Sequence, residues 1–114
     1  MIDMEISEIG DGRHRVRLTG RLDSKAVDAV ESRFSAAVTA SGRRSVVDLS
    51  GVEFVASMGI RMFLMSARAA AGAGARWVAF GVRPTVLEVF EYAGITGIVP
   101  IAADEAAALA QLGS

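Results

Sequence analysis

The feature that most constrains the fold is the stretch at residues 44–52, RSVVDLSGV, in which apolar residues follow one another instead of alternating with polar ones. Such a short, β-branched run is typical of a strand that is buried on both faces, as in a parallel sheet. A helix-like segment comes directly after it, at residues 57–74. A buried strand followed by a helix predicts a parallel sheet whose strands are joined by helical crossovers.

The segments before this strand predict a hairpin and a helix. Residues 3–9 and 14–19 alternate between apolar and polar side chains, and the Asp-Gly pair at 11–12 between them favours a hairpin turn. The next segment is amphipathic over about four helical turns and opens with Asp23 and Ser24, both of which are good N-cap residues. The apolar residues that repeat at helical spacing in this segment are Val27, Val30, Phe34 and Val38.

The segments after the first buried run continue the alternation of strand and helix. Residues 76–82 predict a second buried strand, and residues 83–94 predict a helix with proline in its first turn and glycine at its end. Residues 97–101 predict a short last strand, and residues 103–113 predict a terminal helix. The expected fold is a single α/β domain over 1–114, with a mixed sheet of about five strands and about four helices. Its sheet starts with an antiparallel hairpin and continues with parallel strands.

Composition excludes several classes of function. The chain is 52% apolar and has a formal net charge of -1, which gives no general attraction to nucleic acid or to an anionic membrane. It has no cysteine and one histidine, so disulfides and thiol chemistry are impossible and a zinc site is not expected. The longest uncharged stretch, residues 92–103, is shorter than the roughly 20 residues that cross a bilayer, and the acidic N-terminal segment does not resemble a signal peptide. We therefore expect a soluble, cytoplasmic domain without membrane insertion.

The sequence gives no evidence of catalysis. The single histidine, His14, lies between two arginines on the polar face of a predicted strand, where a Ser-His-Asp site would need it buried and oriented. The glycine-rich stretch at 72–76 follows a helix and precedes a strand, the reverse of a phosphate-binding loop. The basic pair Arg43-Arg44 has no aromatic residues near it, so it does not predict a nucleic-acid patch. We expect no catalytic residue, no metal and no cofactor.

Ser57 is the most informative polar residue, because it begins the helix that follows the first buried strand. It could serve only as a helix N-cap, but the third helical position is Ile60, so there is no capping box. The first turn also lacks an acid and carries Arg61, an arrangement that favours an anion. The sequence therefore indicates that a phosphate on Ser57 would be tolerated. Gly59 is expected to leave room beside the hydroxyl for another protein.

Methionines on the same helix suggest a contact surface. We expect an inward face made of Ile60, Phe63, Leu64 and Ala67. Met58, Met62 and Met65 then fall on a neighbouring, partly exposed face, and methionine adapts readily to a partner surface. They could equally pack under a neighbouring loop, and the sequence leaves both interpretations open.

Three segments resemble one family. LTGRLD at 18–23, VVDLSGVEFVASMGI at 46–60 and VRPTVLEVFEYAGI at 82–95 together are similar to the STAS domain. The whole chain resembles a stand-alone bacterial anti-sigma factor antagonist over nearly all of its 114 residues. The segment at 46–60 is the most specific of the three. The resemblance implies a STAS-type sheet with helices in the order given above.

The resemblance implies partner switching. In this family the unphosphorylated antagonist binds an anti-sigma factor that is also a serine kinase of the GHKL ATPase type, and a client is released. The kinase phosphorylates a serine at the start of the second helix, the complex dissociates, and a serine phosphatase of the PP2C type resets the antagonist. The family motif Asp-Ser-Ser-Gly reads Ala56, Ser57, Met58, Gly59 here, which makes Ser57 the expected phosphoacceptor. Asp23 matches a family aspartate near the acceptor at the partner surface.

The expected partner surface consists of Asp23, Ser24, Met58, Gly59, Arg61, Met62 and Met65. A second hypothesis assigns the chain to a different class, the small STAS subunit of a membrane lipid-transport ATPase. In that case the helix would pack permanently on an ATPase subunit and Ser57 would be only a helix cap.

Overall fold

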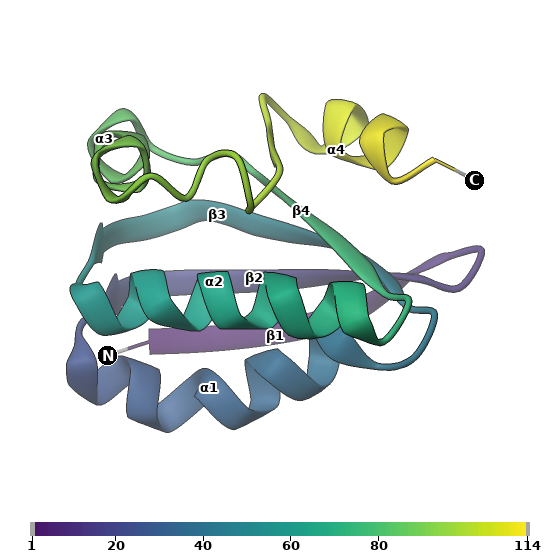
Figure 1. Cartoon of the computed structure of the whole chain (residues 1–114), viewed down its shortest axis with the longest axis horizontal. Coiled ribbons are helices and arrows are strands. Elements are labelled where there is room, and N and C mark those ends of the chain that lie inside the picture. The colour runs from purple at the N-terminus through teal and green to yellow at the C-terminus, as the bar shows by residue number, and fades with distance from the viewer. Residues whose placement is uncertain (1, 114) are drawn as a thin grey trace.

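The computed structural model describes residues 2–113 and contains five strands and four helices in the expected order (Figure 1). The elements are β1 (Ile2–Gly10), β2 (Arg13–Leu22), α1 (Ser24–Thr39), β3 (Arg44–Val55), α2 (Ser57–Gly72), β4 (Arg76–Phe80), α3 (Pro84–Ala93), β5 (Ile101–Ala102) and α4 (Glu105–Leu112). The strands form one sheet in the order β1-β2-β3-β4-β5, with β1 antiparallel to β2 and all other neighbours parallel. The predicted fold class is confirmed. Among the described residues no helix is both long and apolar enough to cross a membrane.

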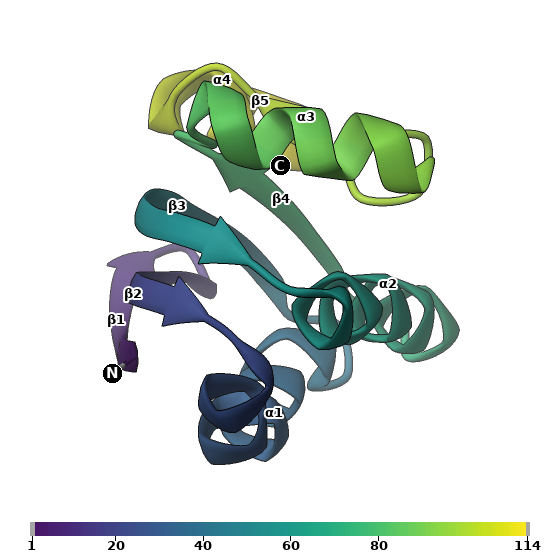
Figure 2. The ribbon, with the colours of Figure 1, turned by 90° about the vertical axis from the view of Figure 1, so that its left-hand side faces the viewer.

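The sheet is covered on both faces. Val47 and Ala79 belong to the larger core, which lies beneath α1 and α2. Their chain neighbours Val46 and Val78 belong to a smaller core with residues of α4, because successive side chains of a strand point to opposite faces. Figure 2 shows α1 and α2 together on one side of the sheet and α4 at its other end. The central strand β3 is therefore buried on both faces, as its unbroken apolar run predicts.

Aromatic rings connect the helices within the larger core. Phe34 of α1 and Phe63 of α2 have ring centroids 5.6 Å apart, and Phe63 lies 5.7 Å from Phe90 of α3. Trp77 of β4 lies 5.7 Å from Phe34 and 6.1 Å from Phe63. These centroid separations are typical of favourable aromatic pairs. The cluster fixes α3 beside α2, and this arrangement positions the surface described below.

Some element bounds differ from the expected ones. β3 continues to Val55 instead of ending near 52, because its pairing with β2 resumes after register shifts and reaches the Leu22–Val55 pair. The last strand is only Ile101–Ala102, because the residues before it form a turn in which the amides of Ile98 and Val99 donate to the Ile95 carbonyl oxygen. Only two register pairs therefore join β5 to β4.

Candidate functional site

Two strand-to-helix junctions lie side by side at the carboxyl edge of the sheet. β2 ends at Leu22 and β3 ends at Val55, and these two residues are direct partners in the parallel pairing. The Ala56 N–H donates to the Leu22 carbonyl oxygen over 2.9 Å, which ties the junctions together. Function gathers at this edge in open α/β sheets. The candidate site is therefore built around Asp23, which follows β2, and Ser57, which follows β3.

Helix α2 begins without a side-chain cap. Ala56 is the N-cap residue, and its carbonyl oxygen accepts hydrogen bonds from the amides of Gly59 at 2.9 Å and Ile60 at 3.1 Å. Its methyl side chain offers no oxygen to the amides of the first turn. Ser57 is the first helical residue and is exposed. The interpretation of Ser57 as the helix cap is wrong, because the chain enters the helix one residue earlier and places Ala56 at the cap position.

The electrostatics of this helix start favour an anion. The first amides of a helix have no intrahelical partner, and the helix dipole adds partial positive charge at this end. The first turn of α2 contains no acidic residue. Arg61 is exposed one turn after Ser57, and within residues 2–113 it makes no hydrogen bond or ion pair through its side chain.

The neighbouring helix α1 does have a cap. Asp23 is its N-cap residue, and Oδ1 of Asp23 accepts a hydrogen bond from the Ala26 N–H over 2.9 Å. The expected start of this helix is confirmed. Asp23 and Ser24 are both exposed, so both are accessible beside the start of α2.

Gly59 has a different role from the expected one. It is buried, and a Cβ atom placed on it would lie 2.8 Å from Val55 Cγ1 and 3.4 Å from both Cβ and the carbonyl oxygen of Leu22. The expectation that Gly59 leaves room for another protein is wrong. Its lack of a side chain instead lets the first turn of α2 approach the ends of β2 and β3.

The methionines of α2 divide between core and surface. Met58 and Met65 are 41% and 50% exposed, which confirms their predicted position. Met62 is only 1% exposed, so the expectation that it lies on the partly exposed face is wrong. The buried residues of α2 are Gly59, Met62, Phe63, Ser66 and Ala70. This stripe includes Gly59, so the close approach of that residue turns Met62 inward, and the expected inward residues Ile60, Leu64 and Ala67 are only partly buried.

A groove between the start of α2 and α3 was missed by sequence reasoning. Its volume is about 560 Å³, and we call it the α2–α3 groove. It is lined by Phe54, Val55, Ala56, Ser57, Ile60, Val89, Tyr92 and Ala93. Figure 2 shows the start of α2 and the length of α3 on the same side of the molecule. Ser57 is therefore part of a largely apolar depression and not an isolated surface hydroxyl.

Part of this groove could have been found in the sequence. Val89 and Tyr92 are three residues apart on α3, on a different face from the buried Val86 and Phe90. A surface helix that is apolar on two faces indicates a second contact. Phe54 gave no such signal, because its exposure depends on the register shift between β2 and β3.

A polar network centred on Asp48 lies on β3. Asp48 of β3 accepts hydrogen bonds from the Ser50 N–H at 2.9 Å, the Ser50 hydroxyl at 2.6 Å and Arg17 Nε at 3.0 Å. Burial raises the pKa of Asp48, but the hydrogen bonds from Ser50 and Arg17 outweigh burial and hold the pKa below its usual value. Arg83 Nε donates to the Ser50 carbonyl oxygen over 2.9 Å and so joins the start of α3 to β3. Both carboxylate oxygens are used within the protein, so this acid is a structural support.

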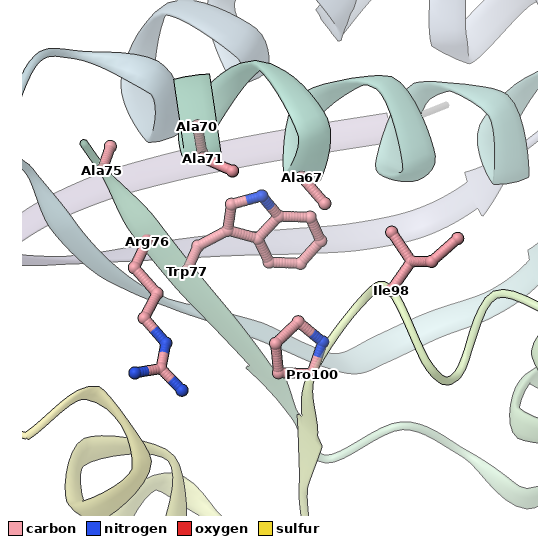
Figure 3. Close-up of a pocket in the computed structure, with 8 residues that line it drawn as sticks. All are labelled: Ala67, Ala70, Ala71, Ala75, Arg76, Trp77, Ile98 and Pro100. Atoms are coloured by element: carbon pink, nitrogen blue, oxygen red, sulfur yellow. The ribbon is translucent and has the colours of Figure 1, made fainter. Parts of the chain in front are cut away.

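A second cavity lies at the opposite edge of the sheet, near the first residues of β4 (Figure 3). It has a volume of about 270 Å³, and alanines of α2 line one side while Ile98 and Pro100 line another. The Trp77 indole lies between these walls, and its buried Nε1 has no hydrogen-bond partner. Among the described residues Arg76 is the only charged one that lines this cavity. Within residues 2–113 no group of three or more acids and histidines is placed to hold a metal ion.

Comparison with known proteins identifies the family. A family model described as "Mlab, STAS domain" matches residues 8–100, so the chain belongs to the STAS domain family. Over 100 residues the chain is 32% identical to BtrV of Bordetella bronchiseptica, which is named as an anti-sigma factor antagonist. That match covers 88% of this chain and 86% of BtrV. The resemblance inferred from the sequence is confirmed.

Solved structures agree on the fold. An anti-sigma factor antagonist from Mycobacterium paratuberculosis superimposes with a TM-score of 0.87 at 22% identity, over 100% of this chain and 96% of the other. The Bacillus cell fate determinant SpoIIAA in its phosphorylated form superimposes with a TM-score of 0.64 at 23% identity, over 92% of this chain and 96% of the other. These identities are low, so the two structures support the fold.

Proposed function

We propose that this protein is an anti-sigma factor antagonist that acts in the cytoplasm by partner switching, with Ser57 as its phosphoacceptor. In its unphosphorylated form it binds an anti-sigma factor that is also a serine kinase of the GHKL ATPase type, and that protein then releases its client. Phosphorylation of Ser57 dissociates the complex, and a PP2C-type serine phosphatase restores binding. The observation that carries the proposal is an exposed serine at the first position of an uncapped helix that has no acid in its first turn.

The fold tolerates a phosphate at this position. A phosphoserine adds about -1.5 to -2 charges at neutral pH and brings acceptor oxygens to the helix start. The first amides of α2 receive no oxygen from the Ala56 side chain, so they are available to such a group. The same phosphate near a helix C-terminus or among acids would be repelled. Phosphorylation is therefore expected to change the surface and leave the fold intact.

The complex does not tolerate the phosphate. Ser57 lies beside the exposed Met58 and within the apolar α2–α3 groove, so a partner can close over a neutral hydroxyl at low cost. A dianion in the same place must be stripped of water or repelled. A loss of about 4 kcal/mol converts a nanomolar complex into a micromolar one.

The relatives support the same interpretation. BtrV, the relative at 32% identity, is named as an anti-sigma factor antagonist, and SpoIIAA, which shares the fold, exists in a phosphorylated form. The alternative, a permanently bound STAS subunit of a lipid-transport ATPase, assigns Ser57 the role of helix cap. The cap position of α2 is occupied by Ala56 and not by Ser57, so a capping role does not account for the serine.

The test compares three purified variants for binding to the GHKL-type anti-sigma factors of the source organism by calorimetry. We expect Ser57→Ala to bind like wild type and Ser57→Asp to bind at least about 100-fold more weakly, a change of about 2.7 kcal/mol. Thr85→Asp is the matched control, because it adds the same charge in the exposed first turn of α3, outside the expected surface. Incubation with the kinase and ATP should add one phosphate at Ser57, as detected by mass spectrometry.

Equal affinity of wild type and Ser57→Asp for the same anti-sigma factor would contradict the switch. Phosphate transfer to another residue while Ser57 stays unmodified would contradict the assignment of the acceptor.

A further inference from the structure

Three large apolar side chains around the α2–α3 groove are exposed. Phe54 and Val89 are each 39% exposed, and Tyr92 is 98% exposed. A single exposed apolar residue is ordinary on a protein surface, but a group of them around one hollow indicates a contact. Aromatic residues are also enriched at the centres of protein interfaces. Phosphorylation at Ser57 does not by itself explain why α3 presents these side chains.

Arg21 supplies a second, independent observation. Its guanidinium carbon lies 4.4 Å from the centroid of the Phe54 ring, so a cation is stacked on one of the residues that line the groove. The three other arginines of the same strand are bound to acids, since Arg13 pairs with Asp11, Arg15 with Glu105 and Arg17 with Asp48. Within residues 2–113 Arg21 makes no ion pair. A guanidinium that lies over an aromatic ring keeps N–H donors in its own plane, where a carboxylate can bind.

We infer that the α2–α3 groove receives an apolar side chain of the anti-sigma factor, and that a carboxylate beside that side chain pairs with Arg21. This inference rests on the proposed function and extends its contact surface from α2 to α3. Tyr92 forms one wall of the groove, and Phe54 with its stacked arginine forms another. The eight residues that line the groove include no charged side chain, so the occupant at its centre is apolar and its charge belongs at the rim.

In this arrangement phosphorylation of Ser57 disrupts a specific contact with the partner. Ser57 lies in the wall of the same groove, so a phosphate on it places a dianion against the apolar occupant. The partner carboxylate that pairs with Arg21 would also face the new negative charge. Release then follows from the loss of one apolar contact in the groove and of one ion pair at its rim. Ser57 and Tyr92 should therefore report on the same contact.

The chain offers a sharp probe, because Tyr92 is its only tyrosine. Protein labelled with 3-fluorotyrosine gives a single ¹⁹F resonance, which can be followed while the anti-sigma factor is added. We expect the resonance to shift on binding and to return when Ser57 is phosphorylated by the kinase with ATP. Because Tyr92 is almost fully exposed, its replacement should leave the melting temperature nearly unchanged.

Affinities complete the test. We expect Tyr92→Ala to weaken binding at least about tenfold, Arg21→Gln to weaken it several-fold, and Tyr92→Phe to stay within about twofold of wild type, because the ring is kept. Ile98→Ala is the matched control, since Ile98 is 42% exposed and lines the cavity at the other edge of the sheet.

The outcomes separate this inference from the proposed function. If Tyr92→Ala and Arg21→Gln bound with wild-type affinity while Ser57→Asp lost binding, the inferred contact in the α2–α3 groove would be contradicted. The proposed phosphorylation switch at Ser57 would not be. A ¹⁹F shift that depends on protein concentration without a partner would assign the groove to a second copy of the chain and overturn the inference. Failure of the wild-type protein to bind any anti-sigma factor of the organism would overturn both.

Discussion

The two junctions at the carboxyl edge of the sheet begin their helices in opposite ways. At the β2–α1 junction Asp23 caps the helix, and its carboxylate binds the Ala26 amide. At the β3–α2 junction Ala56 occupies the same position and offers no side-chain oxygen. The junctions touch, since the Ala56 amide donates to the Leu22 carbonyl oxygen over 2.9 Å. The two helix starts differ in the side chain at the cap position.

The comparison shows where the chain gives up stability. A capping side chain typically contributes about 1 kcal/mol, and α2 lacks it. The residue after the missing cap is Ser57, and an added phosphate could supply the acceptor oxygens that Ala56 does not. An uncapped helix beside a capped one is consistent with a site kept open for an anion. The predictions below test this difference, beginning with the largest effect.

The largest effect should come from the contact that holds the two junctions together. Gly59→Val places a branched side chain where even a Cβ lies 2.8 Å from Val55 Cγ1 and near Leu22. Overpacking of this kind costs up to about 3 kcal/mol, and we expect a loss close to that value in chemical denaturation. Gly72→Val is the matched control on the same helix, because a Cβ there has nothing within 4 Å. Equal effects of both substitutions would contradict the close approach of α2.

Exchanging the caps should change stability in opposite directions. Ala56→Asp should raise the free energy of unfolding by about 1 kcal/mol, because the new carboxylate can accept from an amide of the first turn of α2. Asp23→Ala should lower it by a similar amount, because it removes the bond to Ala26. Denaturant melts of both variants check this. If Ala56→Asp gave no gain, the amides at the start of α2 would already have partners, and the comparison would fail.

The smallest effect concerns pH and the Asp48 network on β3. The pKa of Asp48 is lowered in the folded protein, chiefly because the hydrogen bonds from Ser50 and Arg17 outweigh the effect of burial. A lowered pKa means that the ionised acid stabilises the fold above its unfolded pKa, about 3.9, and that this contribution is lost as the pH falls through the folded value. We expect a small loss of stability in acid, below the cap effects. Measured from pH 6 to 2, the Asp48→Asn variant should show a weaker acid dependence than wild type; an unchanged dependence would exclude Asp48 as its source.

Much of the fold could be predicted because its signals are local. The apolar run of β3, the helical spacing of Val27, Val30, Phe34 and Val38, and the turn at residues 11–12 each act over a few residues. Asp11 and Gly12 both have positive φ, as the predicted hairpin turn requires. Asp23 could be assigned as a cap because capping depends on one side chain and amides three residues away. The length of β3 and the shortness of β5 could not be predicted, because both depend on pairing with strands distant in the sequence.

The candidate site was predicted less completely, and the errors have one physical origin. Ser57, Met58 and Met65 were correctly placed on the surface of the second helix, but Met62 and Gly59 were not. Helical periodicity determines which residues share a face, while packing against β2 and β3 determines which face turns inward.

By itself, the sequence determined the class of fold, the order of its elements and the family, because these follow from local patterns and from matching segments. It also determined that a serine begins α2 in a turn without acids. Only the tertiary structure decided that Ala56 takes the cap position, that Gly59 is buried against Leu22 and Val55, and that α3 forms a groove with Ser57. Those features depend on atoms that are far apart in the chain and meet only when the sheet and helices pack.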